Sequence, residues 1–376
     1  MAAVLTPTNE AELSEAVASA DGPLRILGGG TRPIGRPVTG QVLSLGALSG
    51  VELYDPGALT IVVKAGTPLA EVEALLAKEN QRLPFEPMDH RALLGTQGEP
   101  TIGGVVAANV SGPRRIQAGA CRDSLIGVRF VDGSGTILKN GGRVMKNVTG
   151  YDLVKLMAGS WGTLGVLMEV AFKVLPETET QASVLIDGLS PHQAVEAMST
   201  ALGSPFEITG AAHLPGKSPL TMLRLEGFTA SVAYRTERLS ALLAPFGSVR
   251  ADSDATSVSA AWRDMRDVTA FSDAPGDVWR ISVKPSDAPD IAARAGGDAI
   301  FDWGGGLIWV RVPEATDLRA RLGAFAGHAT LVRASEETRA RIAPFQPAAA
   351  PIAALSEGLR RQFDPRGILN PGLMAA

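Results

Sequence analysis

Residues 27–32 read Leu27-Gly28-Gly29-Gly30-Thr31-Arg32, a triple glycine that directly follows a predicted strand over residues 24–27. Glycine has no Cβ atom, so it adopts positive φ readily and lets another group approach the backbone closely. Successive bare N–H groups in such a turn form a concavity that attracts anions. The turn is not a nicotinamide fingerprint, because Pro33 stands where G-x-G-x-x-G requires its last glycine. We predict a pyrophosphate-binding loop over residues 26–32, with an ordinary glycine-rich surface turn as the alternative.

A second stretch of small residues lies about seventy residues further on. It reads Thr101-Ile102-Gly103-Gly104-Val105-Val106-Ala107-Ala108-Asn109-Val110-Ser111-Gly112. Glycine, alanine and serine recur along it at a spacing that leaves a surface on which a flat ring system could lie. A buried packing seam between a helix and a strand is the alternative.

The third stretch reads Gly159-Ser160-Trp161-Gly162-Thr163-Leu164-Gly165-Val166-Leu167. Gly162 and Gly165 flank a turn into a β run, where main-chain groups could hydrogen-bond the edge of an adenine. A tight turn before a core strand is the alternative. Three such stretches in this order predict that the chain is built around one large dinucleotide.

The remaining pattern is that of a mixed helix and strand protein with short connections. Thr8 or Asn9 is placed to cap a helix, and Pro68 suits the first turn of another that runs to residue 78. Strands are expected over residues 41–45, 60–65 and 163–175, and a hairpin over 125–138. We predict an α+β fold with a dinucleotide-binding domain over residues 1–176, a smaller α+β cap domain over 177–342, and a segment over 343–376 that returns to the first domain.

The bulk composition excludes several classes of protein. The 376 residues are 45% hydrophobic and 20% charged, as in a globular protein with a sizeable core. The formal charge of −4 argues against a nucleic-acid partner, whose footprint would be basic. Cys121 is the only cysteine, so neither an intrachain disulfide nor a cysteine metal cluster can form. No secretion signal is evident, and no apolar run approaches the roughly 18 residues that a membrane helix needs.

The four histidines give no metal site, because no two of them stand at a ligand spacing. His192 and His213 are expected at the surface. His90 follows a loop near the predicted site, and His328 stands in Gly327-His328-Ala329-Thr330; neither is expected to act in catalysis, with a catalytic role as the alternative for each. Residues 211–218 fit a permissive nucleotide P-loop, but Pro219 and a predicted strand follow directly, so we expect a hairpin turn there.

The three stretches, in this order, resemble the FAD-binding domain of the vanillyl-alcohol-oxidase or p-cresol-methylhydroxylase type. Further elements are similar to the family of FAD-binding E subunits of bacterial glycolate oxidases, over nearly the whole length. These elements are residues 35–40, 83–87 and 144–153, Gly112-Pro113-Arg114-Arg115, Trp279-Arg280-Ile281-Ser282, Phe301-Asp302-Trp303-Gly304-Gly305, and the closing Asn370-Pro371-Gly372.

The resemblance places residues 26–32 at the pyrophosphate, 95–101 and 108–111 along the flavin and diphosphate, and 161–167 on the adenine and ribose side. The predicted cofactor-binding residues are Ile26, Leu27, Gly28, Gly29, Gly30, Thr31, Arg32, Pro87, Gly95, Thr101, Gly103, Gly104, Ala107, Ala108, Asn109, Ser111, Gly112, Arg114, Gly162, Gly165, Val166, Leu167 and Asn370.

The chain departs from other members of this superfamily in two ways. Thr31 stands where members that link flavin covalently often have histidine, and Cys121 matches no thioether position, so the resemblance implies noncovalent FAD. The His-rich, Gly-Asp-Gly-Asn metal motif of related α-hydroxyacid dehydrogenases is missing. Cations that could hold a substrate carboxylate are Arg114, Arg115, Arg280 and Lys146, and contacts with a partner or with flavin phosphate are the alternative for them. No base is paired with them, so no catalytic residue is assigned.

The resemblance implies an FAD-binding subunit of a multi-subunit glycolate oxidase or dehydrogenase, which supports or relays the electrons of glycolate oxidation. Its partners would be a catalytic FAD-containing subunit and an iron–sulfur subunit. We expect it in the cytoplasm, or peripheral at the inner membrane through its complex. Two alternatives stay open: a self-sufficient FAD-dependent alcohol or 2-hydroxyacid oxidoreductase, and a subunit whose flavin is structural only.

Overall fold

Two units make up the chain in the computed structural model, which describes residues 4–142 and 150–375. Unit 1 comprises Met1–Ser111, Gly119–Glu177 and Pro347–Ala376, and unit 2 comprises Gly112–Ala118 and Thr178–Gln346. These limits differ from the predicted domains chiefly at residues 112–118, where Ile116 packs against the core of unit 2. Lys146 and most of the 144–153 element lie outside the described residues.

A five-stranded antiparallel sheet is the main sheet of unit 1, in the order β3-β4-β8-β6-β7. Its central strand β8 is buried at six of eight positions. Two small sheets complete the unit: β1 pairs with β2 in parallel, and β5 pairs with β9 antiparallel. The strands are β1 Leu24–Leu27, β2 Gln41–Ser44, β3 Val51–Asp55, β4 Thr60–Lys64, β5 Gln81–Arg82, β6 Leu125–Val131, β7 Ile137–Gly141, β8 Val166–Lys173 and β9 Leu175–Pro176.

Local signals set the helix ends of unit 1. Asn9 caps α1 as expected, since its side chain accepts a hydrogen bond from the Glu12 N–H at 3.0 Å. Pro68 immediately precedes α2, whose residues Leu69, Val72 and Leu76 are buried at helical spacing. The helices are α1 Glu10–Ala18, α2 Leu69–Lys78, α3 Arg91–Leu94, α4 Ile102–Ala108, α6 Cys121–Ser124, α7 Leu153–Met157 and α14 Ala350–Phe363.

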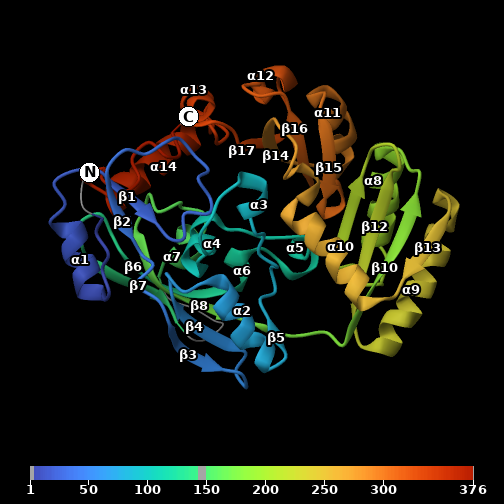
Figure 1. Cartoon of the computed structure of the whole chain (residues 1–376), viewed down its shortest axis with the longest axis horizontal. Coiled ribbons are helices and arrows are strands. Elements are labelled where there is room, and N and C mark those ends of the chain that lie inside the picture. Colours follow the sequence, from blue (N-terminus) through green and yellow to red (C-terminus); the bar gives the residue numbers. More distant parts are fainter. Residues whose placement is uncertain (1–3, 143–149, 376) are drawn as a thin grey trace. The chain divides into compact units, whose positions relative to one another are not determined.

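Unit 2 is built on an eight-stranded antiparallel sheet, in the order β13-β10-β12-β11-β15-β16-β14-β17. Its helices α8 and α9 lie beside the sheet in Figure 1. The strands are β10 Thr180–Asp187, β11 Gly210–Leu214, β12 Leu220–Gly227, β13 Val249–Asp252, β14 Asp277–Val283, β15 Asp298–Asp302, β16 Leu307–Val312 and β17 Gly327–Arg333. The helices are α5 Arg115–Ala118, α8 Pro191–Leu202, α9 Thr229–Leu243, α10 Ala255–Asp267, α11 Ala288–Ala295, α12 Leu318–Leu322 and α13 Glu336–Arg341, with 3₁₀ turns η1 Ala244–Phe246, η2 Thr269–Phe271, η3 Pro285–Asp287 and η4 Trp303–Gly305.

The two faces of this sheet differ in character. Alternate residues such as Leu223, Phe301 and Ile308 pack under α8, α9 and α11 and form the core. The intervening residues face the other way and include Arg224, Glu226 and Arg280. The α+β class predicted from the sequence is confirmed, and so is the hairpin over 211–218, which joins β11 to β12 in place of a P-loop.

The expectation that His213 lies at the surface was wrong. Its side chain is 1% exposed, because β11 is an inner strand of the sheet, and its ring contacts Phe301 while Nδ1 lies 3.0 Å from Thr221 Oγ1. Burial lowers the pKa of His213 from 6.5 to about 4, because the imidazolium would lose its hydration.

This shift predicts a pH dependence of stability. Between about pH 6.5 and 4 the unfolded histidine binds a proton that the folded one does not, so stability falls as the pH falls through this window. We expect His213 to contribute a loss of about 2 kcal/mol between pH 7 and 5. Urea unfolding at both pH values should show a smaller loss in His213→Asn, and equal losses in both proteins would contradict the assignment.

Candidate functional site

The first glycine-rich loop of unit 1 lies directly against residues 96–101. A Cβ atom on Gly29 would lie 1.7 Å from the Glu99 carbonyl oxygen, and one on Gly28 would lie 2.4 Å from Thr101 Oγ1. The Thr96 hydroxyl donates to the Thr31 carbonyl at 3.1 Å. Both glycines are therefore required for close backbone approach rather than for a positive φ.

Asn370 joins the third loop to the first. Its Oδ1 accepts from the Ile26 N–H and its Nδ2 donates to the Trp161 carbonyl, both at 2.9 Å. Gly162 has a φ of +71°, and a Cβ atom there would lie 2.9 Å from Asn370 Nδ2. The Trp161 N–H also donates to the Ala107 carbonyl at 2.9 Å, which links this loop to α4. All three glycine-rich stretches consequently meet in unit 1.

Helix α4 has one packed face and one open face. Gly103 is buried, and a Cβ atom there would lie only 2.6 Å from that of Ala65. At this position the packing seam is therefore the correct interpretation. Gly104, Ala107 and Ala108 are half-buried on the other side. The open side of α4 presents no side chain larger than a methyl group at these three positions, which suits contact with a planar group.

Arg32 is the one predicted cation in the glycine-rich loop, and its guanidinium is incompletely paired. Its Nε donates to His90 Nδ1 at 3.2 Å, while its buried Nη2 has no hydrogen-bond partner among residues 4–142 and 150–375. Burial lowers its pKa to about 10, against the opposing charge of Asp89, so Arg32 stays protonated at neutral pH. A Cβ atom on Gly104 would lie 3.2 Å from its Nη1, which places the cation beside the helix. A buried donor of this kind is suited to an anion.

Several predicted residues serve the protein framework with their side chains. Asn109 ends α4 with a φ of 50°, and its Oδ1 accepts from the Arg122 N–H at 3.0 Å. The Ser111 hydroxyl accepts from the Cys121 N–H at 3.0 Å. Thr101 caps α4 by accepting from the Gly104 N–H at 3.3 Å. The polar side-chain atoms of Asn109, Ser111 and Thr101 are thus engaged within the protein, and a ligand would contact the main-chain groups of these residues.

Other predicted residues are held by packing or by backbone geometry. Gly95 is exposed and ends α3 with a φ of +62°, whereas Pro87 is buried. A Cβ atom on Gly165 would lie 2.6 Å from the Phe130 ring, and the side chains of Val166 and Leu167 are buried in β8.

Two of the predicted residues belong to unit 2. The Gly112 carbonyl accepts from the Trp303 indole at 3.1 Å, and Arg114 is bound to Glu226 by contacts of 2.7–3.2 Å. Sequence reasoning missed Glu226, although Arg224 and Glu226 stand out as two charges on one face of an otherwise apolar strand. It also missed the contact between His90 and Arg32, for which no local signal exists.

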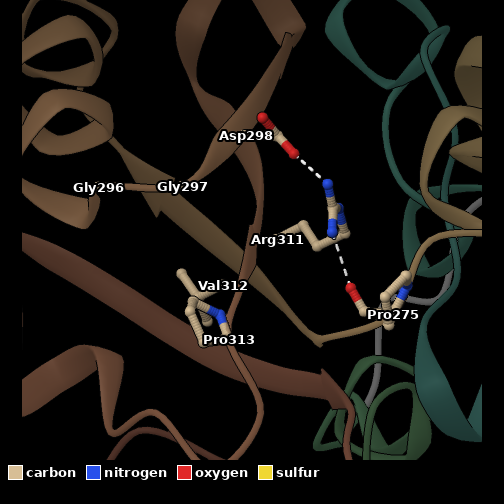
Figure 2. Close-up of a pocket in the computed structure, with 7 residues that line it drawn as sticks. All are labelled: Pro275, Gly296, Gly297, Asp298, Arg311, Val312 and Pro313. Carbon is tan, nitrogen blue, oxygen red and sulfur yellow. Dashed lines mark hydrogen bonds and ion pairs between the residues drawn. The ribbon is translucent and has the colours of Figure 1, made fainter.

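A groove of about 390 Å³ lies where β15 begins and β16 ends in unit 2, and prolines, glycines and the ion pair of Arg311 with Asp298 line it. Figure 2 shows these lining residues. Arg311 also donates to the Pro275 carbonyl at 2.7 Å. The groove contains none of the predicted site residues. In the described part of the chain, no group of three or more His, Cys, Asp or Glu side chains could hold a metal ion, and no helix is long and apolar enough to span a bilayer.

Comparison with known proteins agrees with this geometry. Residues 1–141 match the family model described as an FAD binding domain. The chain is 37% identical to the glycolate oxidase subunit GlcE of Escherichia coli (strain K12) over 357 residues, which cover 94% of this chain and 93% of that protein. It is 29% identical to the glycolate oxidase subunit GlcD of Bacillus subtilis (strain 168), over 66% of this chain and 53% of that protein.

The fold is that of p-cresol methylhydroxylase, which matches with a TM-score of 0.71 at 15% identity over 99% of this chain and 88% of that one. The expectation of this fold and of FAD as cofactor is thereby confirmed. With an FAD-binding domain at its N-terminus and a likeness that runs through both units, the chain belongs to the family of the glycolate oxidase subunit GlcE.

Proposed function

We propose that this chain is the FAD-binding subunit of a multi-subunit enzyme that oxidises glycolate to glyoxylate. The observation that carries the proposal is the meeting of the three glycine-rich stretches in unit 1 beside the unpaired Nη2 donor of Arg32. FAD, when bound, supplies the electron-accepting chemistry of such an oxidation.

Each part of the site has a defined task in this proposal. The backbone of residues 28–32 and the guanidinium of Arg32 hold the diphosphate by N–H donors and positive charge. The open side of α4 at Gly104, Ala107 and Ala108 accepts the ring system. The main chain of residues 161–167 takes the adenine and ribose side, and Asn370 positions that loop against β1.

The cofactor is held without a covalent bond in this proposal. Thr31 offers a hydroxyl, which does not form the histidyl link found elsewhere in the superfamily. Cys121 is fully buried, and burial raises the pKa of its thiol, with Arg32 and Lys155 opposing the rise, so the reactive thiolate is not populated.

The catalytic base is assigned to the partner rather than to this chain. His90, the candidate base of unit 1, is 6% exposed and accepts from Arg32 at Nδ1. We therefore propose a catalytic FAD-containing subunit and an iron–sulfur subunit as partners, with this chain supporting or relaying electrons. The purified chain should contain flavin but turn over little glycolate alone.

Replacing Arg32 by Gln tests the site. The loss of a charge-assisted contact should weaken FAD binding to the full chain by about tenfold to a hundredfold, measured by titration of the apoprotein with FAD fluorescence. Arg25→Gln is the matched control. Arg25 is exposed on β1, so its replacement should leave the conformation of residues 28–32 unchanged.

Acid precipitation of the yellow wild-type protein should release all flavin into the supernatant. Flavin that stays with the precipitate would contradict noncovalent binding. Equal FAD affinity of Arg32→Gln and Arg25→Gln would contradict the role of Arg32, and a chain that binds no FAD would contradict the proposed function.

A further inference from the structure

Three sequence elements that are far apart in the chain meet at Trp303 in unit 2. The indole N–H of Trp303 donates to the Gly112 carbonyl at 3.1 Å. The guanidinium of Arg115 lies 4.5 Å from the Trp303 ring centroid, and that of Arg280 lies 4.9 Å from the same centroid. The elements Gly112–Arg115, Trp279–Ser282 and Phe301–Gly305, which first singled out the family, therefore form one cluster.

The cluster holds more positive than negative charge. Its one carboxylate belongs to Asp302, which is buried and accepts from the Trp303 N–H at 2.7 Å. Within residues 4–142 and 150–375, the Arg280 guanidinium makes no hydrogen bond and no ion pair. Burial and, to a smaller extent, the charge of Arg115 lower the pKa of Arg280 to about 10, against the opposing charge of Asp302. Two cations at one ring repel each other unless an anion joins them.

Neighbouring strands add polar groups on the same face of the sheet. Arg280 on β14 stands opposite Thr330 on β17, and Ser282 stands opposite His328. Because side chains alternate along a strand, these four residues share one face. The Arg280, Ser282 and Thr330 side chains are half-buried, so a small ligand there would be partly shielded from water but could still enter.

We propose that this cluster is a binding site for the carboxylate of a small 2-hydroxyacid or 2-oxoacid, an inference that rests on the proposed function and names where its substrate or product binds. Arg280 donates to the carboxylate, Arg115 supplies further positive charge, and both guanidinium groups contact the Trp303 ring. Ser282 and Thr330 offer hydroxyl groups to the oxygen on the neighbouring carbon. Arginine suits this task because its planar fork matches the geometry of a carboxylate.

A purely structural cluster would behave differently. Cation–π packing of Arg115 and Arg280 on Trp303 fastens residues 112–118 to the unit whether or not an anion is present. If the cluster is only structural, a substitution harms it by removing packing volume. If it binds an anion, a substitution harms it by removing positive charge. Arg280→Met keeps most of the volume without the charge, and Arg280→Lys keeps the charge without the fork.

The test is calorimetric titration of the full chain, purified with its bound cofactor, with sodium glycolate. We expect saturable binding that Arg280→Met weakens by about tenfold to a hundredfold and that Arg280→Lys partly restores. Arg250→Gln is the control within unit 2, because Arg250 forms an exposed pair with Asp187 on β10 at the other edge of the sheet. Ethylene glycol, which lacks the carboxylate, should not bind.

Equal glycolate affinity in wild type and Arg280→Met would overturn the proposal, and so would inorganic phosphate that binds as tightly as glycolate. Thermal unfolding of each variant shows whether lost binding reflects lost folding. Flavin content measured on the same samples separates the two proposals: a yellow protein that ignores glycolate refutes only the carboxylate site, whereas a colourless protein refutes the proposed function.

Discussion

Replacing Gly29 by Ala is expected to abolish FAD binding and to destabilise the chain by about 3 kcal/mol, the upper end for overpacking a tight contact. The new Cβ atom would lie 1.7 Å from the Glu99 carbonyl oxygen and 2.6 Å from its carbonyl carbon. These are backbone atoms, so no side-chain rotation relieves the overlap. Residues 28–32 would move away from residues 96–101, and with them the Arg32 cation. FAD titration and thermal unfolding measure the two effects.

Gly22→Ala is the matched control for Gly29→Ala. No atom lies within 4 Å of a Cβ atom built on Gly22, which precedes the same strand β1, so both FAD affinity and stability should stay at the wild-type level. If Gly29→Ala bound FAD as tightly as Gly22→Ala, the close approach of the two loops would not be needed for the site.

Replacing Glu226 by Ala is expected to destabilise unit 2 by about 3–5 kcal/mol, because it removes the carboxylate that pairs with the buried Arg224 and the partly exposed Arg114. Glu226 pairs with Arg114 at 2.7 Å and with Arg224 at 3.6 Å, and the side chains of Glu226 and Arg224 are 2% and 1% exposed. Arg224 also donates to Thr209 and stacks on Trp262, so it cannot turn to solvent. Urea unfolding followed by tryptophan fluorescence measures the effect, since Trp262, Trp279, Trp303 and Trp309 all lie in unit 2.

Arg250→Gln provides the comparison for Glu226→Ala. It breaks the pair with Asp187, in which both side chains are about half exposed, and such pairs contribute about 0–1 kcal/mol. A destabilisation of Glu226→Ala no larger than that of Arg250→Gln would show that the Arg114–Glu226–Arg224 group is not effectively buried.

Elements with a strong local signal could be predicted from the sequence. Asn9 ahead of an apolar stripe predicted α1, Pro68 predicted the start of α2, and the turn at 132–135 predicted the β6–β7 hairpin. Weaker signals failed in identifiable ways. The Ala-rich stretch over residues 315–326 predicts a helix, but only Leu318–Leu322 is helical, because Gly323 ends it with a φ of +63°. Strand β3 was not predicted at all, since Val51–Asp55 alternates only partly between apolar and polar residues.

The candidate site likewise could be predicted only in part from the sequence. Glycines can be recognised in the sequence, but the reason for each differs: Gly29 approaches a carbonyl group, Gly103 packs on Ala65, and Gly162 needs its positive φ. The sequence does not distinguish these cases, because the atoms that a Cβ would meet come from residues distant in the chain.

What the sequence alone determined is the set of parts: the three glycine-rich stretches, the helix and strand periodicities, and the likeness to a flavoprotein family. These depend on the backbone freedom of single residues and on patterns within a few turns of chain. The tertiary structure decided which parts meet. Asn370 reaches Ile26, Arg32 meets His90, and Glu226 pairs with Arg114 only because folding brings together groups 58 to 344 residues apart. Such pairings arise from the need to satisfy buried charges and hydrogen bonds, a requirement that acts in space and leaves no periodic signal along the chain.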